Sequence, residues 1–138
     1  MFPVFMNAKS KGTRAERELL HRFWQTKQFV VMRAPGSGSI KYPCPDLLVG
    51  NNLRKMAIEC KSPGGLIQYF TAKEIADLHS FSAIFGAEPW VAIRFSPDQK
   101  PEWYFISVED IDATNGGNFV VTHAAAQRKG LLFEELVK

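Results

Sequence analysis

Two carboxylates and a lysine in this chain have the spacing and chemistry to hold a divalent metal ion. Asp46 follows Pro45 directly, and Glu59 and Lys61 flank Cys60 further along the chain. Hard cations such as Mg²⁺ prefer oxygen ligands, commonly one or two carboxylates completed by water and substrate phosphate. A metal held in this way stabilises the charge that builds on phosphorus when a phosphodiester is attacked. The pattern therefore suggests metal-dependent phosphodiester hydrolysis.

A predicted hairpin explains how these residues could meet. Residues 47–50 and 55–58 read as two apolar strands joined by an Asn-rich turn. Side chains on a strand alternate between faces, so Glu59 and Lys61 share one face and the Cys60 thiol points away. The Cys60 carbonyl could add a metal ligand if the strand edge is open there. Lys61 would orient or deprotonate the attacking water, or neutralise charge on the phosphate, and the sequence leaves these roles open.

The same pattern also has a purely structural interpretation. Asp opens many turns, and Glu-x-Lys often lines the solvent-facing side of a strand. The setting favours catalysis, because Glu59 ends the apolar run 56–58. An ionised carboxylate beside buried strands is costly unless it is paired or bound to a metal. We therefore interpret Asp46 and Glu59 as metal ligands.

The composition indicates a single globular domain over residues 1–138, in which residues 1–10 would form a flexible basic arm. The chain is 46% hydrophobic and 22% charged, which is core material for one domain. Its two cysteines, Cys44 and Cys60, lack CxxC spacing, which argues against a zinc site and favours a reducing cytoplasm. No stretch approaches twenty apolar residues, so we expect no membrane partner.

The N-terminal part of the chain is basic. The net charge is +3, but residues 1–41 contain eight Lys or Arg and two Glu. A basic segment joined to an acidic metal site is the polarity expected for a polyanionic substrate. Any one of these charges could equally belong to a solvated helix face. The candidates for phosphate contact include Lys9, Lys11, Arg14 and Lys41.

Helices and strands alternate along the rest of the sequence. An apolar stripe at helical spacing predicts a helix over 13–27. A capping box of Thr71 and Glu74 begins a second helix, which Gly86 ends. The other predicted elements are strands at 29–32, 89–95, 102–106 and 119–121, a helical turn at 108–111 and a last helix at 131–137. We expect an α/β fold with a sheet of about five strands.

Glu16 has two interpretations. Thr13 and Glu16 match a capping box, in which Glu16 would only accept a hydrogen bond from the Thr13 amide. If the first helix instead packs its N-terminal turns beside the hairpin, Glu16 becomes a third carboxylate for the metal or its waters. Spacing alone favours the cap.

Several segments of the chain resemble the archaeal Holliday junction resolvase (Hjc) family. They are residues 11–20, the loop 33–39, Pro45–Asp46, Glu59–Lys61 and residues 81–86. Their order and approximate spacing match over most of the chain, specifically as far as about Phe105. The resemblance implies the restriction-endonuclease-like fold, a central mixed sheet flanked by helices. It also implies a homodimer that uses Mg²⁺, for which Mn²⁺ should substitute, to cut four-way branched DNA.

The resemblance assigns roles to single residues. Glu16 matches the family's N-terminal catalytic glutamate, which reverses the assignment from spacing, and Lys61 matches its catalytic lysine. Asp46 and Glu59 match its metal-binding carboxylates. Relatives often have Val or Met at the position of Cys60, a departure that matters little if only its carbonyl faces the metal.

Three further residues are implicated in substrate contact or catalysis by the resemblance. Arg17 and Arg33 match basic positions that contact the substrate. Ser37 matches a serine in the mobile loop before the catalytic aspartate, although a flexible spacer would have the same composition.

A twofold assembly follows from the expected reaction. Resolving a junction requires two nicks in opposed strands, and each chain has one predicted metal site, so two chains are needed. Phe81 and Phe85, four residues apart on the second helix, are candidates for the interface, although ordinary core residues have the same spacing. A sliding clamp or another recombination protein is a further partner to consider.

We therefore expect paired, symmetric nicks that leave 5′-phosphate and 3′-hydroxyl ends, made in an archaeal cytoplasm at the nucleoid. A restriction-type or repair endonuclease of the same fold is an alternative, but no segment is large enough to be a base-reading insertion. A catalytically inactive DNA-binding module is another. A suitable residue at every catalytic position argues against it.

Overall fold

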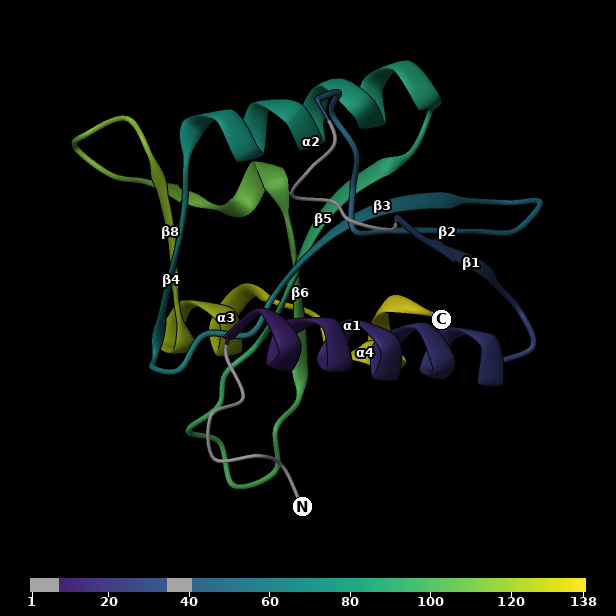
Figure 1. Ribbon diagram of the computed structural model, residues 1–138, viewed down its shortest axis with the longest axis horizontal. Coiled ribbons are helices and arrows are strands. Elements are labelled where there is room, and N and C mark those ends of the chain that lie inside the picture. Colours follow the sequence, from purple (N-terminus) through teal and green to yellow (C-terminus); the bar gives the residue numbers. More distant parts are fainter. Residues whose placement is uncertain (1–7, 35–40) are drawn as a thin grey trace.

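The computed structural model describes residues 8–34 and 41–138, and of residues 8–11 it describes the backbone alone. Helices lie on both faces of a central sheet (Figure 1). In chain order the elements are α1 (Ala8–Gln25), β1 (Val30–Arg33), β2 (Leu47–Gly50), β3 (Lys55–Lys61), β4 (Ile67–Phe70), α2 (Ala72–Phe85), β5 (Glu88–Arg94), β6 (Trp103–Ser107), η2 (Val108–Asp110), β7 (Asp112–Ala113), β8 (Phe119–Thr122), α3 (His123–Lys129) and α4 (Phe133–Leu136).

The central sheet has five strands, the number that the sequence predicted, in the order β1-β2-β3-β5-β6. β3 and β5 are parallel and the other pairs are antiparallel. A parallel pair needs a long crossover, which β4 and α2 supply here. The predicted hairpin of β2 and β3 is confirmed, and the side-chain oxygen of Asn51 closes its turn by accepting hydrogen bonds from the amides of Leu53 and Arg54. The sheet is therefore mixed, with β3 at its centre.

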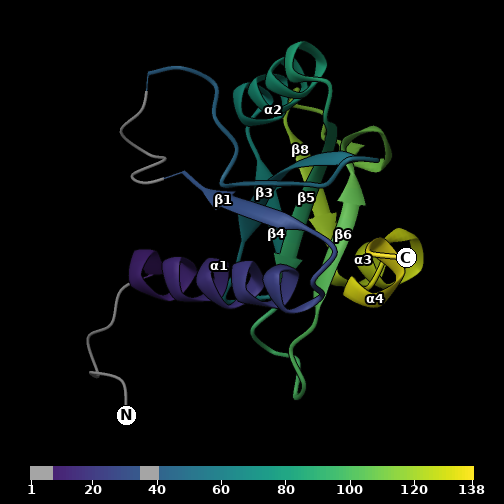
Figure 2. The same ribbon diagram turned by 90° about the vertical axis from the view of Figure 1, so that its right-hand side faces the viewer.

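The two faces of the sheet build two separate cores. Met56, Ile58 and Cys60 of β3 pack on one face with α1 and α4. Ala57, which lies between Met56 and Ile58 in the sequence, packs on the other face with α2. Figure 2 shows α1 and α2 on opposite sides of the sheet. The second core also receives Phe70 of β4. Alternation along β3 therefore decides which side chains face which helix.

Helix α1 begins earlier than the sequence predicted. It runs from Ala8 to Gln25 instead of from 13 to 27, so residues 8–10, expected in a flexible arm, are helical. Residues 1–7 lie outside the described part of the chain. Thr13 is inside the helix, so the capping-box interpretation of Thr13 and Glu16 is wrong. The predicted apolar stripe is confirmed at Leu19 and Phe23, but Trp24 is 46% exposed.

A second sheet, in the order β4-β8-β7, was not predicted as a unit. The strand at residues 119–121 was predicted and lies in β8, but β4, β7 and helix α3 were missed. β4 has four residues and pairs with β8 about fifty positions away, so its register depends on non-local contacts. Within the described ranges, no helix is long and apolar enough to cross a membrane.

Both ends of helix α2 are formed by the residues that the sequence predicted. The Thr71 hydroxyl accepts a hydrogen bond from the Glu74 amide at 3.0 Å, and the Glu74 carboxylate accepts one from the Thr71 amide at 3.0 Å. This reciprocal pair is the capping box. Gly86 terminates the helix with φ 85°, a left-handed conformation that glycine adopts without strain.

The face of α1 that packs on the sheet can be tested by mutation. Phe23 has no exposed surface and its ring contacts Phe29, Phe105 and Phe133. Phe23→Ala should lower the free energy of unfolding by about 3–5 kcal/mol, because it leaves a cavity in this aromatic cluster. The neighbouring Trp24→Ala is the control and should cost much less. Equal losses measured by denaturant titration would contradict the described packing.

Candidate active site

The end of β3 is open on the side that faces β2. The pairing of β2 with β3 reaches only to Leu47 and Ile58, whereas β5 continues beside β3 as far as Lys61. Beyond the last β2 pair, the Asp46 carboxylate takes over and its Oδ2 accepts a hydrogen bond from the Cys60 amide at 2.8 Å. The Asp46 carbonyl accepts another from the Ala34 amide at 3.0 Å. Asp46 is thereby fixed between the ends of β1 and β3.

Two carboxyl groups share this buried place. Asp46 is only 5% exposed. Burial, followed by the negative charge of Asp46, raises the pKa of Glu59 to about 8, and the positive charge of Lys61 partly opposes this rise. The fold therefore holds Glu59 close to Asp46 although the charge of one makes it harder to ionise the other. A divalent cation between them would remove the repulsion.

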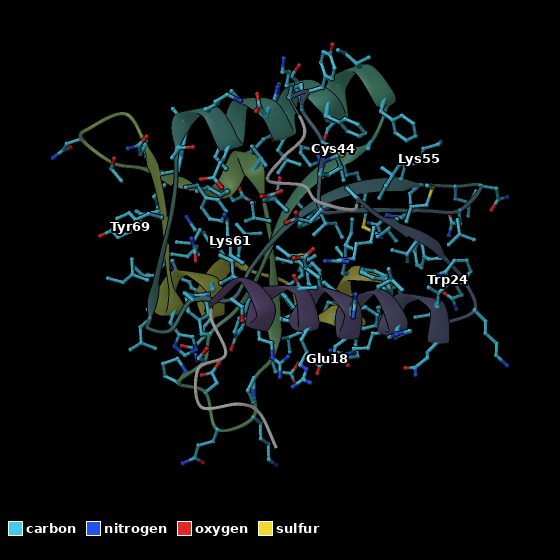
Figure 3. The ribbon with its side chains drawn as sticks, in the orientation of Figure 1. Glu18, Trp24, Cys44, Lys55, Lys61 and Tyr69 are labelled. Carbon is cyan, nitrogen blue, oxygen red and sulfur yellow. The ribbon has the colours of Figure 1, made fainter. Side chains whose placement is uncertain are left out.

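Lys61 is held by a third acid, from helix α2. Its Nζ lies 2.7 Å from Glu74 Oε2 and 5.9 Å from the centre of the Phe70 ring. Burial would lower the pKa of Lys61, but the hydrogen bond and charge of Glu74, with the charges of Glu59 and Asp46, raise it overall. Figure 3 shows Lys61 between α1 and α2 in this view. The side chain therefore stays an ammonium, which can stabilise negative charge but cannot accept a proton.

Glu16 approaches the same place from helix α1. Its Oε1 lies 3.4 Å from Arg33 Nε, and both side chains are largely buried. Burial raises the pKa of Glu16, the charge of Asp46 raises it further, and Arg33 opposes the rise. The structure thus brings Glu16 beside Arg33 and within the electrostatic reach of Asp46, as the resemblance implied. The interpretation from spacing alone failed because α1 begins five residues before Thr13.

The cysteine thiols near this site are not prepared for metal binding. The Cys60 thiol is buried in the core beneath α1, where burial and neighbouring carboxylates raise its pKa well above the ordinary value. Its direction away from Glu59 confirms the predicted alternation. Burial followed by the charges of Asp46 and Glu59 also raises the pKa of Cys44. Both thiols therefore stay protonated, and thiolates are the form that ligates metals.

The donor set nevertheless fits a hard divalent cation. Within the described residues, no three His, Cys, Asp or Glu side chains gather into a group that could hold a metal ion. Mg²⁺ requires fewer protein ligands, because one or two carboxylates suffice when waters and phosphate complete its shell. Asp46 and Glu59 supply two carboxylates whose mutual repulsion favours a cation. The Cys60 amide faces Asp46 on the open side of β3, and the carbonyl of a strand residue points to the same side as its amide, so this oxygen is a candidate third ligand.

The other predicted site residues are distributed around this centre. Arg14, Arg17 and Lys41 are exposed, and the first two lie on the same helix as Glu16. Phe81 and Phe85 stack with ring centres 5.6 Å apart. Phe85 is 47% exposed, whereas Phe81 packs partly on the core beneath α2. The side chains of Lys9 and Lys11 and all of Ser37 lie outside the described part of the structure.

One residue at this site was missed from the sequence. Glu74 was predicted only as the partner of Thr71 in the capping box, and it also binds Lys61. Burial would raise the pKa of Glu74, but hydrogen bonds from Lys61 and from the Thr71 amide, with the charge of Lys61, lower it overall. Glu74 lies thirteen positions after Lys61 in the sequence, and no local motif signals such a contact. Only the packing of α2 on β3 reveals it.

The fold and this cluster define a class of protein. A five-stranded mixed sheet flanked by helices, with acids and a lysine gathered at one end of a central strand, is the restriction-endonuclease-like nuclease architecture. The comparisons with known proteins then identify the family within that class.

The family model described as "Archaeal holliday junction resolvase (hjc)" matches residues 7–138. The crossover junction endodeoxyribonuclease Hjc of Archaeoglobus fulgidus is 40% identical over 106 residues, which are 77% of this chain and 75% of the relative. The protein of the same name from Methanocaldococcus jannaschii is 35% identical over 111 residues, 80% of this chain and 75% of the relative. This chain belongs to the Hjc family.

A solved structure supports the same assignment. The 1.6 Å structure of Archaeoglobus fulgidus Hjc, a Holliday junction resolvase from an archaeal hyperthermophile, superposes with a TM-score of 0.81 at 34% sequence identity. The match covers 92% of this chain and all of the other. The predicted fold class is confirmed.

The raised pKa of Glu59 predicts a pH dependence of stability in the presence of EDTA. Its folded-state pKa of about 8 exceeds the ordinary 4.5, so between these values the folded protein binds more protons than the unfolded chain. The free energy of unfolding should therefore fall as the pH rises from about 4.5 toward 8, because folding then requires Glu59 to stay protonated or to be buried as an anion. Glu59→Gln should become more stable relative to wild type over the same range.

Denaturant titrations between pH 5 and pH 9 measure this difference. Glu109→Gln, which changes an exposed carboxylate on η2, is the matched control and should follow wild type. A Glu59→Gln protein whose stability differs from wild type by a constant amount at every pH would contradict the assigned environment.

Proposed function

We propose that this chain is a metal-dependent endonuclease that resolves four-way DNA junctions by paired, symmetric nicks. The observation that carries the proposal is the gathering of Asp46, Glu59 and Lys61 at the open end of β3. Membership of the Hjc family gives the class of substrate, because the two relatives are named crossover junction endodeoxyribonucleases. The products would be 5′-phosphate and 3′-hydroxyl ends.

Asp46, Glu59 and the Cys60 carbonyl would hold the metal ion, which we propose to be Mg²⁺ with Mn²⁺ as a substitute. When bound, such an ion supplies a more acidic water and stabilises the negative charge on the attacked phosphorus. The buried site favours the ion because the charge of Asp46 raises the cost of ionising Glu59, and a cation would offset that cost. Water attacks phosphorus in line and displaces the 3′ oxygen of the scissile bond.

The remaining residues of the cluster would act on charge and water. Lys61, which stays protonated, neutralises the charge that develops on the phosphate oxygens. Glu16 accepts hydrogen bonds from waters at the site, and Arg33 holds it in place. Of the roles that the sequence left open for Lys61, deprotonation of the attacking water is the one that this environment disfavours.

Basic residues next to the cluster would bind the DNA backbone. Arg14 and Arg17 are exposed on α1 on the same helix as Glu16, and Lys41 is exposed at the start of the segment that leads to Asp46. Phosphate contacts of this kind give affinity without reading the base sequence. We propose that Lys9, Lys11, Arg33 and Ser37 complete this surface.

A homodimer would supply the second active site. Two chains related by a twofold axis present two equivalent sites to opposed strands of a junction. The exposed Phe85, stacked on Phe81 at the end of α2, is the proposed centre of the interface. A sliding clamp or another recombination protein as a partner, and a place in the cytoplasm at the nucleoid, stay predictions from the sequence.

Cleavage assays on defined DNA substrates test the proposed function. The protein should cut a mobile-core four-way junction with paired nicks, leave linear duplex and single strands intact, and lose activity with EDTA. Asp46→Asn and Lys61→Ala should each lower the cleavage rate at least about a hundredfold, because each removes a group that acts on the transition state. Both variants should bind the junction as wild type does in a gel-shift assay.

Two outcomes would overturn parts of this proposal. Equal cutting of linear duplex would favour a restriction-type or repair endonuclease and would retain the nuclease assignment. Wild-type turnover by either variant would remove the role assigned to that residue.

The proposed interface predicts the oligomeric state of a surface variant. Phe85→Glu should convert the dimer to a monomer in sedimentation experiments, because it puts a charge into an apolar contact. The monomer should nick junctions once instead of making paired cuts. Leu53→Glu, which changes an 86% exposed apolar residue on the hairpin turn, is the control and should stay dimeric. A dimeric Phe85→Glu protein would place the interface elsewhere.

A further inference from the structure

Glu74 joins the active site to the first turn of helix α2. One carboxylate oxygen, Oε1, accepts hydrogen bonds from the amide and the hydroxyl of Thr71 at 3.0 and 3.2 Å. The other, Oε2, lies 2.7 Å from Lys61 Nζ. The side chains of Lys61 and Glu74 are 29% and 31% exposed, so both are partly shielded from water. One carboxylate therefore serves the helix cap and the lysine together.

Several acids lie within electrostatic reach of Lys61, but among the described residues it forms an ion pair with Glu74 alone. Glu59 and Asp46 act on the ammonium through their charge, whereas Glu74 binds it directly. An ammonium that moved onto Asp46 or Glu59 would compete with a divalent cation for the same oxygens. The contact with Glu74 keeps the Lys61 ammonium near Asp46 and Glu59 without a direct ion pair to either of them.

We infer that Glu74 is a positioning residue that fixes the Lys61 ammonium for the reaction. Its own position is fixed twice, by the hydrogen bond from the Thr71 backbone amide and by the packing of α2 on β3 through Ile75 and Leu78. A charged hydrogen bond from such a rigid support restricts a long, flexible side chain. The inference rests on the proposed function, because the reaction gives Lys61 its role.

The cap and the ion pair can be separated by the choice of substitution. Glutamine at this helix position still completes a capping box, so Glu74→Gln retains the contact with Thr71. It loses the negative charge that holds Lys61. Thr71→Ala does the reverse, because it removes the hydroxyl from the cap and leaves the carboxylate on Lys61. Asp77→Asn removes one negative charge from the same helix, from a surface pair with Lys73.

Single-turnover cleavage of a four-way junction with Mg²⁺ measures the effect. Glu74→Gln should lower the cleavage rate about tenfold, the scale typical of residues that support a catalytic group. Its affinity for the junction should equal that of wild type, and its denaturation midpoint should fall only slightly, because the lost ion pair is partly exposed to solvent. Thr71→Ala should have a lower denaturation midpoint and a wild-type cleavage rate, and Asp77→Asn should match wild type in both.

A double variant distinguishes failure of this inference from failure of the proposed function. Combined with Lys61→Ala, Glu74→Gln should cause no further loss, because it acts only through the lysine. A wild-type rate for Glu74→Gln alone, or an additive loss in the double variant, would overturn the inference and leave the function intact. A wild-type rate for Lys61→Ala would instead overturn the role that the proposed function gives to Lys61, on which the inference rests.

Discussion

The hydrogen bond from the Cys60 amide to the Asp46 carboxylate is the contact on which the site depends. The backbone ladder between β2 and β3 ends at Leu47 and Ile58, and this bond continues it with a charged acceptor. It keeps Asp46 beside Glu59 although burial and charge disfavour that proximity. The contacts around β3 thus hold two carboxyl groups close together, and a divalent cation would relieve the repulsion between them.

The layers of the fold meet at this one strand end. Helix α1 brings Glu16 from one face of the sheet, where it pairs with Arg33 at the end of β1. Helix α2 brings Glu74 to Lys61 on the other face, and its last turn carries the exposed Phe85. Because the proposed dimer contact and the lysine's partner lie on the same helix, assembly and the active site share a rigid element.

Local patterns were sufficient to predict much of this structure. The turn at Asn51, the alternation through Cys60 and the cap at Thr71 each depend on neighbours a few residues away. The second sheet could not be predicted, because β4 acquires its partner from a distant segment. The same limit applied to the site: Glu16 matched a local cap that the earlier start of α1 removed, and the contact of Glu74 with Lys61 exists only through packing. The resemblance to a family corrected the first of these and gave no hint of the second.

The central claim is that the acids at the end of β3 form a site for a divalent cation. Anomalous diffraction from crystals grown with Mn²⁺ tests it most directly. We expect one or more Mn²⁺ peaks beside the carboxylates of Asp46 and Glu59 and the carbonyl oxygen of Cys60, and none there in Asp46→Asn crystals. Mn²⁺ bound elsewhere, with this site empty at a concentration that supports junction cleavage, would contradict the claim.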